Sequence, residues 1–361
     1  MKVSSKIHIN LKRVIDDSYD IDIGMSLQEA GKDINRCYPE IKKFVITDSN
    51  VAKFYGKSFI NTLRQHGNHL LVVPAGEKSK NRKIKEQLES RLLSLGVKRD
   101  SLVIALGGGV IGDLTGFVAA TLLRGIPYIQ VPTTLLAQVD SSIGGKVAVD
   151  HPLGKNLIGA FYQPKKVYID PSTLATLSDA EFANGMAEVI KYAAIMDKTL
   201  FAYLEENSTK IRARNLEALH RIIKRCCELK KSVVQKDEKE TGLRRILNFG
   251  HTIGHSVESL SHYRIPHGQA IAIGMICEAT MSVKLGLLSE HTLQRLERLI
   301  AAYHLPTSLP KAMSVHNIIK ATAHDKKAQG KEIHYTLLER IGKARIGVSL
   351  SMEHVRELLT Q

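Results

Sequence analysis

The sequence predicts an α/β protein in which an N-terminal parallel-sheet domain precedes a C-terminal domain that is mainly α-helical. The chain has 361 residues, a length typical of two domains. Hydrophobic residues make up 43% of it, but only 5% are aromatic and none is Trp, which favours aliphatic packing of helices on a sheet. Strand-like and helix-like segments alternate in the first half, whereas the second half shows mostly helical periodicity.

The first half reads as repeated strand–helix units, which predict parallel pairing. Apolar β-branched runs predict strands at residues 43–47, 69–73, 101–106 and 128–131. Helical spacing predicts helices at residues 51–66, 81–95 and 114–123. Gly96 follows the second of these helices and is a typical residue for ending it.

The segment 133–163 has little periodicity and is rich in Gly, Ser and Asp. A long irregular stretch in a compact domain is usually functional. Beyond Pro171 the pattern becomes helical, and Ser178 followed by Glu181 predicts a capping box at a helix start. We therefore expect two domains, residues 1–177 and 178–361.

The formal net charge is +15, from 51 Lys and Arg against 36 Asp and Glu. These basic residues are dispersed, and no nucleic-acid-binding motif accompanies them, so the charge favours small anionic ligands over nucleic acid. The four cysteines show no CxxC spacing, which is typical of a reducing compartment. No apolar run is long enough to cross a bilayer, so we expect a cytoplasmic protein without a membrane partner.

A glycine-rich turn follows the predicted strand at 101–106. Gly107-Gly-Gly-Val-Ile-Gly112 satisfies GxGxxG, a pattern that lets backbone N–H groups at a helix start approach phosphates. The alternative is a tight turn needed only for packing. Asp113 would repel a pyrophosphate beside it, so the sequence also predicts a departure from the usual dinucleotide turn.

Polar residues also follow the two preceding strands, in Asp48-Ser-Asn50 and Gly76-Glu-Lys-Ser-Lys80. The carboxyl ends of parallel strands are where α/β proteins bind ribose hydroxyls. Helix capping is an equally good explanation of these side chains.

Histidines form the second candidate site. His251 and His255 lie four residues apart on one helical face, and His267 follows in Pro266-His-Gly268. Glu188 on another predicted helix would complete a site of two histidines and a carboxylate that leaves positions open for substrate. The chain has 15 histidines, and spacing alone favours ordinary surface or core roles for these.

A third candidate is the segment from Asp140-Ser-Ser-Ile-Gly-Gly-Lys146 to Gly154-Lys-Asn156. Its ammonium groups and exposed amides are suited to an anion, although it could also be a solvated loop.

Several longer motifs are specific enough to indicate a family. They are Gly107-Gly-Gly-Val-Ile-Gly-Asp113, Gln130-Val-Pro-Thr-Thr134, Asp140-Ser-Ser-Ile-Gly-Gly-Lys146, Met186-Ala-Glu-Val-Ile-Lys191 and Asn248-Phe-Gly-His-Thr-Ile-Gly-His255, followed by His267-Gly268. In order and spacing the chain resembles the 3-dehydroquinate synthase family, from about Asp48 to the Asp325-Lys-Lys327 segment. The resemblance implies a Rossmann-like domain that binds NAD and a helical domain that holds a divalent metal, Zn²⁺ or alternatively Co²⁺.

The resemblance also implies individual roles. It makes Glu188, His251 and His267 the metal ligands and His255 a general acid/base or substrate contact. The residues that it assigns to NAD are Asp48, Asn50, Glu77, Lys80, Gly108, Gly109, Asp113, Thr133, Thr134, Lys146, Lys155, Thr176, Leu177 and Glu181.

The implied substrate is an anionic sugar phosphate, 3-deoxy-D-arabino-heptulosonate 7-phosphate. The implied reaction is transient oxidation by NAD, β-elimination of phosphate, reduction and an intramolecular aldol closure to 3-dehydroquinate. Residues implied at the phosphate end are Lys146, Asn156, one of Lys326 and Lys327 (Lys326 is preferred), and Arg124 from the partner of a homodimer. Residues implied at the carboxylate end are Lys230, Arg244 and Asn248, with Asp140, Lys155 and Lys191 lining the pocket.

Three alternative functions are open to a chain with these motifs. Another sugar-phosphate cyclase, such as 2-deoxy-scyllo-inosose synthase, would use the same cofactors, but its substrate has no carboxylate for Lys230 and Arg244 to bind. A metal-dependent alcohol dehydrogenase such as glycerol dehydrogenase would not need the anion-binding segment that ends at Asn156. A basic nucleic-acid-binding module would show steep salt dependence.

Overall fold

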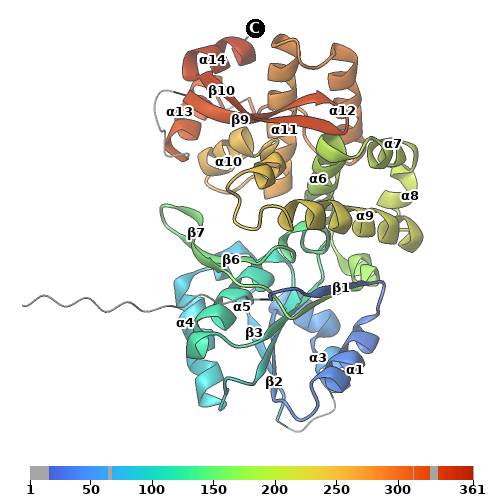
Figure 1. Ribbon diagram of the computed structural model, residues 1–361, viewed down its shortest axis with the longest axis vertical. Coiled ribbons are helices and arrows are strands. Elements are labelled where there is room, and N and C mark those ends of the chain that lie inside the picture. The colour runs from blue at the N-terminus through green and yellow to red at the C-terminus, as the bar shows by residue number, and fades with distance from the viewer. Residues whose placement is uncertain (1–15, 64–66, 312, 326–331, 361) are drawn as a thin grey trace, which may run out of the picture.

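The computed structural model describes residues 16–63, 67–311, 313–325 and 332–360. The N-terminal half forms one lobe, built around a sheet, and the C-terminal half forms a second, mainly helical lobe (Figure 1). The predicted boundary at residue 177 falls between the 3-10 helix η5 (Pro171–Thr176) and helix α6 (Asp179–Met196), and it stays a prediction.

The N-terminal lobe contains a six-stranded sheet in which every pairing is parallel. Its order is β1-β8-β5-β4-β2-β3. The strands are β1 (Asp20–Ile23), β2 (Lys43–Asp48), β3 (His69–Val73), β4 (Leu102–Gly107), β5 (Tyr128–Pro132) and β8 (Lys166–Ile169).

Both faces of this sheet are buried, which explains the continuous apolar runs of its central strands. Successive residues of β2 enter opposite cores: Phe44 and Ile46 pack toward helices α4 (Arg82–Ser94) and α5 (Gly109–Thr121), while Val45 packs toward α1 (Leu27–Cys37). Short helical segments connect these elements. They are α2 (Ser49–Val51), the π-helix η1 (Ala52–Gly56), α3 (Lys57–Thr62), η2 (Glu77–Ser79) and η3 (Leu122–Arg124).

Strand order reverses between β2 and β4. The chain passes from β2 outward to β3, then returns to β4 on the other side of β2 and continues through β5. In open α/β sheets such a switch point creates a crevice at the carboxyl ends of the strands. Asp48 at the end of β2 and the glycine turn at the end of β4 therefore face the same edge of the sheet.

The segment 133–163, expected to be irregular, contains a π-helical turn and a β-hairpin. The turn is η4 (Ala137–Ser141), and the hairpin pairs β6 (Lys146–His151) with β7 (Gly154–Phe161) in antiparallel register. Alternation was hard to see in the sequence because only β6 packs closely on α5, whereas β7 is mostly exposed.

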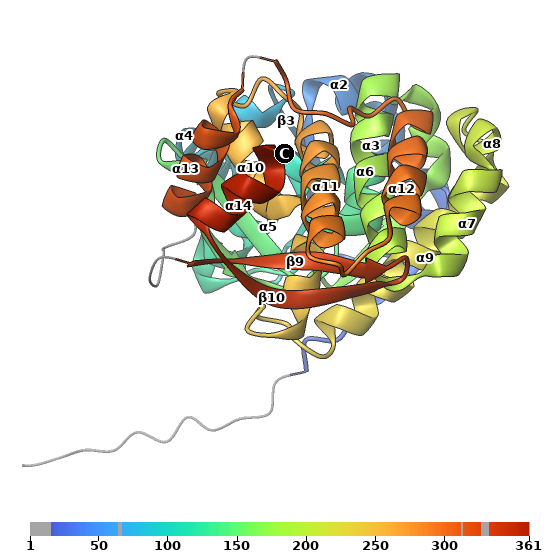
Figure 2. The same ribbon diagram turned by 90° about the horizontal axis from the view of Figure 1, so that it is seen from above.

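The C-terminal lobe is a helical assembly with one hairpin (Figure 2). Its remaining elements are α7 (Lys198–Glu206), α8 (Ser208–Arg212), α9 (Leu216–Val234), η6 (Leu243–Asn248), α10 (His251–Leu260), α11 (His267–Lys284), α12 (Glu290–Ala302), α13 (Val315–Asp325), β9 (Glu332–Arg340), β10 (Lys343–Ser351) and α14 (Met352–Thr360). Helix α6 is buried along nearly its whole length, so it forms the centre of this lobe.

Most predicted elements of the sheet are confirmed, including β3 at both ends and Gly96 directly after the α4 C-cap Leu95. The capping box at Ser178 is half formed: its hydroxyl accepts a hydrogen bond from Glu181 N, while the Glu181 carboxylate accepts one from Asn184. Strand β1, helix α1 and the β9–β10 hairpin were not predicted from the sequence.

Within the described residues, no helix combines the length and apolar character needed to span a bilayer.

Candidate active site

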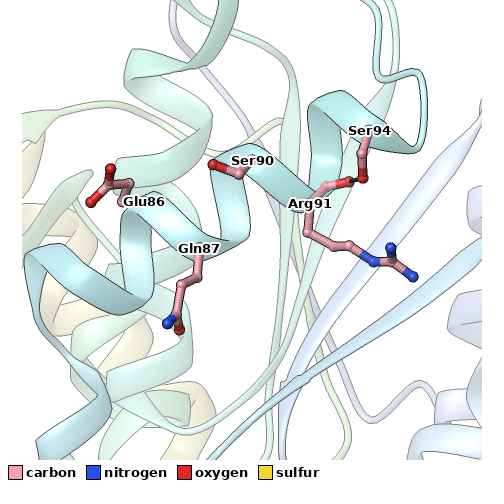
Figure 3. Close-up of a pocket in the computed structure, with 5 residues that line it drawn as sticks. All are labelled: Glu86, Gln87, Ser90, Arg91 and Ser94. Carbon is pink, nitrogen blue, oxygen red and sulfur yellow. Dashed lines mark hydrogen bonds between the residues drawn. The ribbon is translucent and has the colours of Figure 1, made fainter.

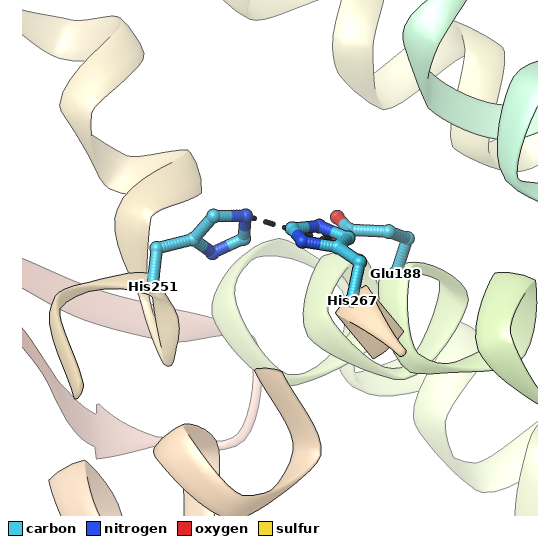
Figure 4. A group of neighbouring side chains, drawn as sticks. All are labelled: Glu188, His251 and His267. Atoms are coloured by element: carbon cyan, nitrogen blue, oxygen red, sulfur yellow. Dashed lines mark ion pairs between the residues drawn. The ribbon is translucent and has the colours of Figure 1, made fainter. Parts of the chain in front are cut away.

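The three predicted metal ligands converge from three helices (Figure 4). Glu188 lies in the middle of α6, and His251 and His267 are the first residues of α10 and α11. Glu188 Oε1 is 3.5 Å from His251 Nε2 and 3.4 Å from His267 Nε2. The sequence separates these residues by up to 79 positions, and only the packing of α6 against α11, and of α11 against α10, brings them together.

The Glu188 carboxylate is suited to a cation. Its side chain is 1% exposed, and apart from ion-pair contacts with Lys191 and the two imidazoles neither oxygen has a hydrogen-bond partner. Burial alone would raise the pKa of Glu188, but Lys191 and the histidines outweigh it, so the carboxyl stays ionised. A buried carboxylate with open lone pairs beside two imidazoles is a donor set that binds Zn²⁺ or Co²⁺.

The two histidines are held in different ways. His251 Nδ1 is 3.2 Å from the Phe249 carbonyl oxygen, which leaves Nε2 for the centre of the cluster. Burial, followed by the positive charge of Lys191, lowers the pKa of His251 well below its usual value. Burial alone would also lower the pKa of His267, but contacts with Glu188 and Glu258 outweigh it and raise the pKa to about 9.

His255 lies beside this cluster. Its ring centroid is 5.3 Å from that of His251 and 6.2 Å from that of His267. The i, i+4 spacing read from the sequence therefore does place both imidazoles on one face of α10, as predicted.

A second cluster occupies the edge of the sheet. Lys80 Nζ is 2.5 Å from both Asp113 Oδ2 and Asn156 Oδ1, which joins η2, α5 and the β6–β7 hairpin. Burial alone would lower the pKa of Lys80, but the Asp113 carboxylate outweighs it and raises the pKa. Asp113 therefore pairs with a lysine, which removes the repulsion expected between this acid and a nearby phosphate.

The glycine turn at the start of α5 leaves no room for side chains. A Cβ on Gly108 would lie 2.8 Å from Thr134 Cγ2, and one on Gly109 would lie 3.0 Å from Ser141 Oγ. Gly108 is the N-cap of α5 and contributes no side-chain cap, so the first N–H groups of the helix are available to a ligand. The Thr133 hydroxyl beside this turn is buried and has no hydrogen-bond partner.

Other residues predicted to bind the cofactor have mainly structural contacts. Asp48 caps α2 through Asn50 N and Val51 N, at 2.8 and 3.0 Å. Thr176 Oγ1 lies 2.7 Å from Tyr55 Oη, and the Leu177 carbonyl accepts a hydrogen bond from Arg214. Glu77 contacts Lys155 at 4.0 Å.

Two basic residues expected at the substrate are buried and hydrogen-bonded within the protein. Lys230 Nζ donates to the Asp140 carboxylate at 2.8 Å and to its backbone carbonyl at 2.6 Å. Burial lowers the pKa of Lys230, and Asp140 only partly offsets this. Arg244 is 3% exposed and donates to the carbonyl oxygens of Gly144 and Glu238.

The sequence analysis missed three residues of the site. Glu240 accepts hydrogen bonds from Lys146 and Asn248, so it joins the two ends of the expected substrate pocket. Tyr192 donates to Asp140, and Glu258 contacts both His267 and Lys155. Acidic residues near a site for an anion gave no signal of their own in the sequence, because their role depends on which cations they meet.

Arg124 stands apart from both clusters. Arg124 is exposed at the end of η3, at the C-terminal end of α5, whereas the glycine turn lies at its N-terminal end. Lys326 and Lys327 lie outside the described residues.

A surface hollow on α4, lined by Glu86, Gln87, Ser90, Arg91 and Ser94, shares no residue with either cluster (Figure 3).

Known proteins resemble this chain over most of its length. The family model for the 3-dehydroquinate synthase N-terminal region matches residues 70–184, and the model for its C-terminal region matches residues 185–328. A 3-dehydroquinate synthase of Pseudoalteromonas atlantica is 46% identical over 95% of this chain and 97% of its own length.

Solved structures share the fold. A 2-epi-5-epi-valiolone synthase from Streptomyces hygroscopicus with NAD⁺ and Zn²⁺ bound is 28% identical, with a TM-score of 0.89 over 97% of this chain and 98% of that one. A 2-deoxy-scyllo-inosose synthase complexed with carbaglucose-6-phosphate, NAD⁺ and Co²⁺ is 27% identical, with a TM-score of 0.82 over 94% and 95%. The matched family models and the curated relative together establish that this chain belongs to the 3-dehydroquinate synthase family.

Proposed function

We propose that the protein is a 3-dehydroquinate synthase, a lyase that converts 3-deoxy-D-arabino-heptulosonate 7-phosphate to 3-dehydroquinate and phosphate. The observation that carries this is the meeting of Glu188, His251 and His267, with Lys191 and His255 beside them. Curated relatives with this activity are 44–50% identical over 88–95% of the chain, against 27% for the 2-deoxy-scyllo-inosose synthase. That difference favours the synthase over the other cyclase.

The residues present fit both cofactors. Glu188, His251 and His267 would hold a divalent metal, with Zn²⁺ as the first candidate and Co²⁺ as the second. The free N–H groups at Gly108 and Gly109 and the buried Thr133 hydroxyl would receive NAD at the switch point of the sheet. When bound, NAD supplies a hydride acceptor and donor, and the metal supplies Lewis-acid polarisation.

The chain's own residues bind and orient the substrate. Lys146 and Asn156, on the hairpin, would bind the phosphate end. Asn156 has φ of +57°, an uncommon conformation for a residue other than glycine, and such strain is concentrated at functional sites. Arg244 and Lys230 would bind the carboxylate from the C-terminal lobe, so a substrate held at both ends would bridge the two lobes.

Proton transfer falls to residues around the Glu188 cluster. His255 would serve as acid/base or as a contact to a substrate hydroxyl. Asp140 accepts hydrogen bonds from both Lys230 and the Tyr192 hydroxyl, which holds a buried cation and a hydroxyl on the same carboxylate. Burial and the Asp140 carboxylate raise the pKa of Tyr192 well above its usual value, so this hydroxyl stays protonated.

A homodimer in the cytoplasm completes the proposal. Leu123, Arg124 and Gly125 have φ of +51°, +69° and +112°, a strained turn that presents Arg124 at the surface. Exposed Leu157 and Phe161 on β7 add apolar area that a second copy would cover. All four cysteines are free, in keeping with a reducing compartment.

The decisive experiment measures phosphate release from the heptulosonate phosphate with catalytic NAD, with and without a chelator, while absorbance reports NADH. We expect chelator-sensitive release of phosphate without stoichiometric accumulation of NADH, because oxidation and reduction cancel within one turnover. Folded protein that holds NAD and metal yet releases no phosphate would contradict the assignment. Accumulation of NADH in solution would instead indicate a dehydrogenase.

A further inference from the structure

A buried carboxylate of α10 contacts the histidine that begins α11. Glu258 is 2% exposed, and its Oε2 lies 3.1 Å from His267 Nδ1. Its other oxygen accepts a hydrogen bond from Lys155 Nζ at 3.0 Å. Lys155 comes from β7, so Glu258 connects the hairpin of the N-terminal lobe to the proposed metal site.

His267 has a different partner on each ring nitrogen. Nε2 faces Glu188 Oε1 at 3.4 Å, and Nδ1 faces Glu258. A carboxylate on one nitrogen retains the proton there and leaves the lone pair of the other nitrogen free for a metal. The same contact fixes the rotation of the ring about the Cβ–Cγ bond of His267.

Glu258 could instead be a ligand, because His255, Glu258 and His267 also lie close enough to hold a cation. The contacts argue against this. Both Glu258 oxygens already accept a hydrogen bond, whereas the buried oxygens of Glu188 have no hydrogen-bond partner. The cation therefore belongs with Glu188, and Glu258 contacts the ligand His267 rather than the cation itself.

We propose that Glu258 is a positioning residue that sets the tautomer and orientation of His267 for metal binding. This rests on the metal site proposed above. Lys155 holds the second oxygen but does not itself orient the imidazole, so removal of the lysine and removal of the carboxylate have different consequences for the metal.

The test compares Glu258→Gln with Lys155→Met in the full chain. The dissociation constant for Zn²⁺ is measured by competition with a chromophoric chelator, and the visible spectrum is recorded with Co²⁺ in place of Zn²⁺. We expect Glu258→Gln to weaken Zn²⁺ binding by about 10- to 100-fold and to alter the Co²⁺ spectrum. Lys155→Met should change the dissociation constant by less than about twofold.

Equal Zn²⁺ affinity in Glu258→Gln and the parent protein would overturn the proposal, and so would equal weakening by Lys155→Met. His251→Ala separates this result from failure of the metal site, because unchanged binding in that variant would place the metal elsewhere. If Glu258→Gln does not fold, nitrogen-15 NMR of the imidazoles in the Zn²⁺-loaded parent decides. A proton on His267 Nδ1 supports the proposal, and a proton on Nε2 overturns it.

Discussion

Gly250 and Gly274 bring the backbones of α10 and α11 into direct contact. A Cβ added to Gly274 would lie 1.9 Å from the Gly250 carbonyl oxygen and 2.8 Å from Gly254 N. Gly250 has φ of +78°, and its N–H donates to the buried carboxylate of Glu278 on α11 at 2.7 Å. This contact fixes the start of α10, and therefore His251, relative to the helix that begins with His267.

Gly274→Ala should separate these helices. Because the obstacle is backbone, we expect a loss of about 1–3 kcal/mol or more in the free energy of unfolding, together with weaker metal binding. Urea denaturation and chelator competition measure the two effects. Thr280→Ala on the same helix removes a methyl group and a hydroxyl that donates to Ile276 O, and it should have little effect on metal affinity. Unchanged metal affinity in Gly274→Ala would show that the close approach does not position His251.

His251→Ala should abolish turnover while leaving the fold largely intact. It removes one of three proposed ligands, so we expect turnover to fall by at least about 100-fold with loss of bound metal. Atomic emission measures the bound metal, and circular dichroism reports whether the fold is intact. His291→Ala, at an exposed position on α12, is the matched control. Full activity with full metal content would contradict the ligand assignment.

Arg244→Ala should weaken substrate binding with little change in NAD affinity. The guanidinium donates to the carbonyl oxygens of Gly144 and Glu238, and neither of these residues is predicted to bind NAD. Its loss removes a charge-assisted contact of about 1.4–2.7 kcal/mol, or 10- to 100-fold in kcat/KM. Steady-state kinetics and NAD titration measure these separately. The neighbouring Arg245 is exposed, so Arg245→Ala serves as control. Parallel losses for substrate and NAD would place Arg244 elsewhere.

Asp237 should make the loop before α10 sensitive to acid. Backbone hydrogen bonds from Arg244, Gly242 and Thr241 lower the pKa of Asp237 to about 2. A carboxyl with a lowered native pKa stabilises the fold above its unfolded pKa of about 3.9, and this contribution is lost as pH falls toward about 2. The stability difference between the parent and Asp237→Asn should therefore be constant above about pH 5 and shrink below it. Urea midpoints between pH 7 and pH 3 measure it, and a difference independent of pH would contradict this assignment.

Arg124 should act on the partner's site. Co-expression of Arg124→Ala with His251→Ala would form mixed dimers, in which one site receives both an intact His251 and an intact Arg124 if the arginine acts across the dimer. Random pairing then restores about a quarter of the parent activity. If Arg124 acts within its own chain, every site in the mixture lacks one group, and no activity returns. Each variant expressed alone is the control.

Most strands of the sheet and much of the candidate site could be predicted from local sequence. Apolar runs such as 102–106 predict buried parallel strands because both of their faces must pack. The GxGxxG spacing from Gly107 to Gly112 predicts the turn because glycine lets the backbone approach a phosphate, and the structure adds that a side chain at Gly107, Gly108 or Gly109 would meet its neighbours. The spacing of His251 and His255 follows from the helical repeat. Residue chemistry suggested that Glu188 could join two of the histidines, but the choice of His251 and His267 as ligands came from the resemblance, since no local rule links positions so far apart.

The sequence by itself determined strands β2 to β5, the helices that connect them and which residue types could bind a cation or an anion. Tertiary structure alone decided how these groups are paired: Asp113 with Lys80, Glu240 with Lys146, and Glu258 with His267. Propensity and periodicity act over one or two turns of chain, whereas the charge state and orientation of a buried side chain depend on partners brought from distant segments by packing. The acidic residues around this site were missed for that reason.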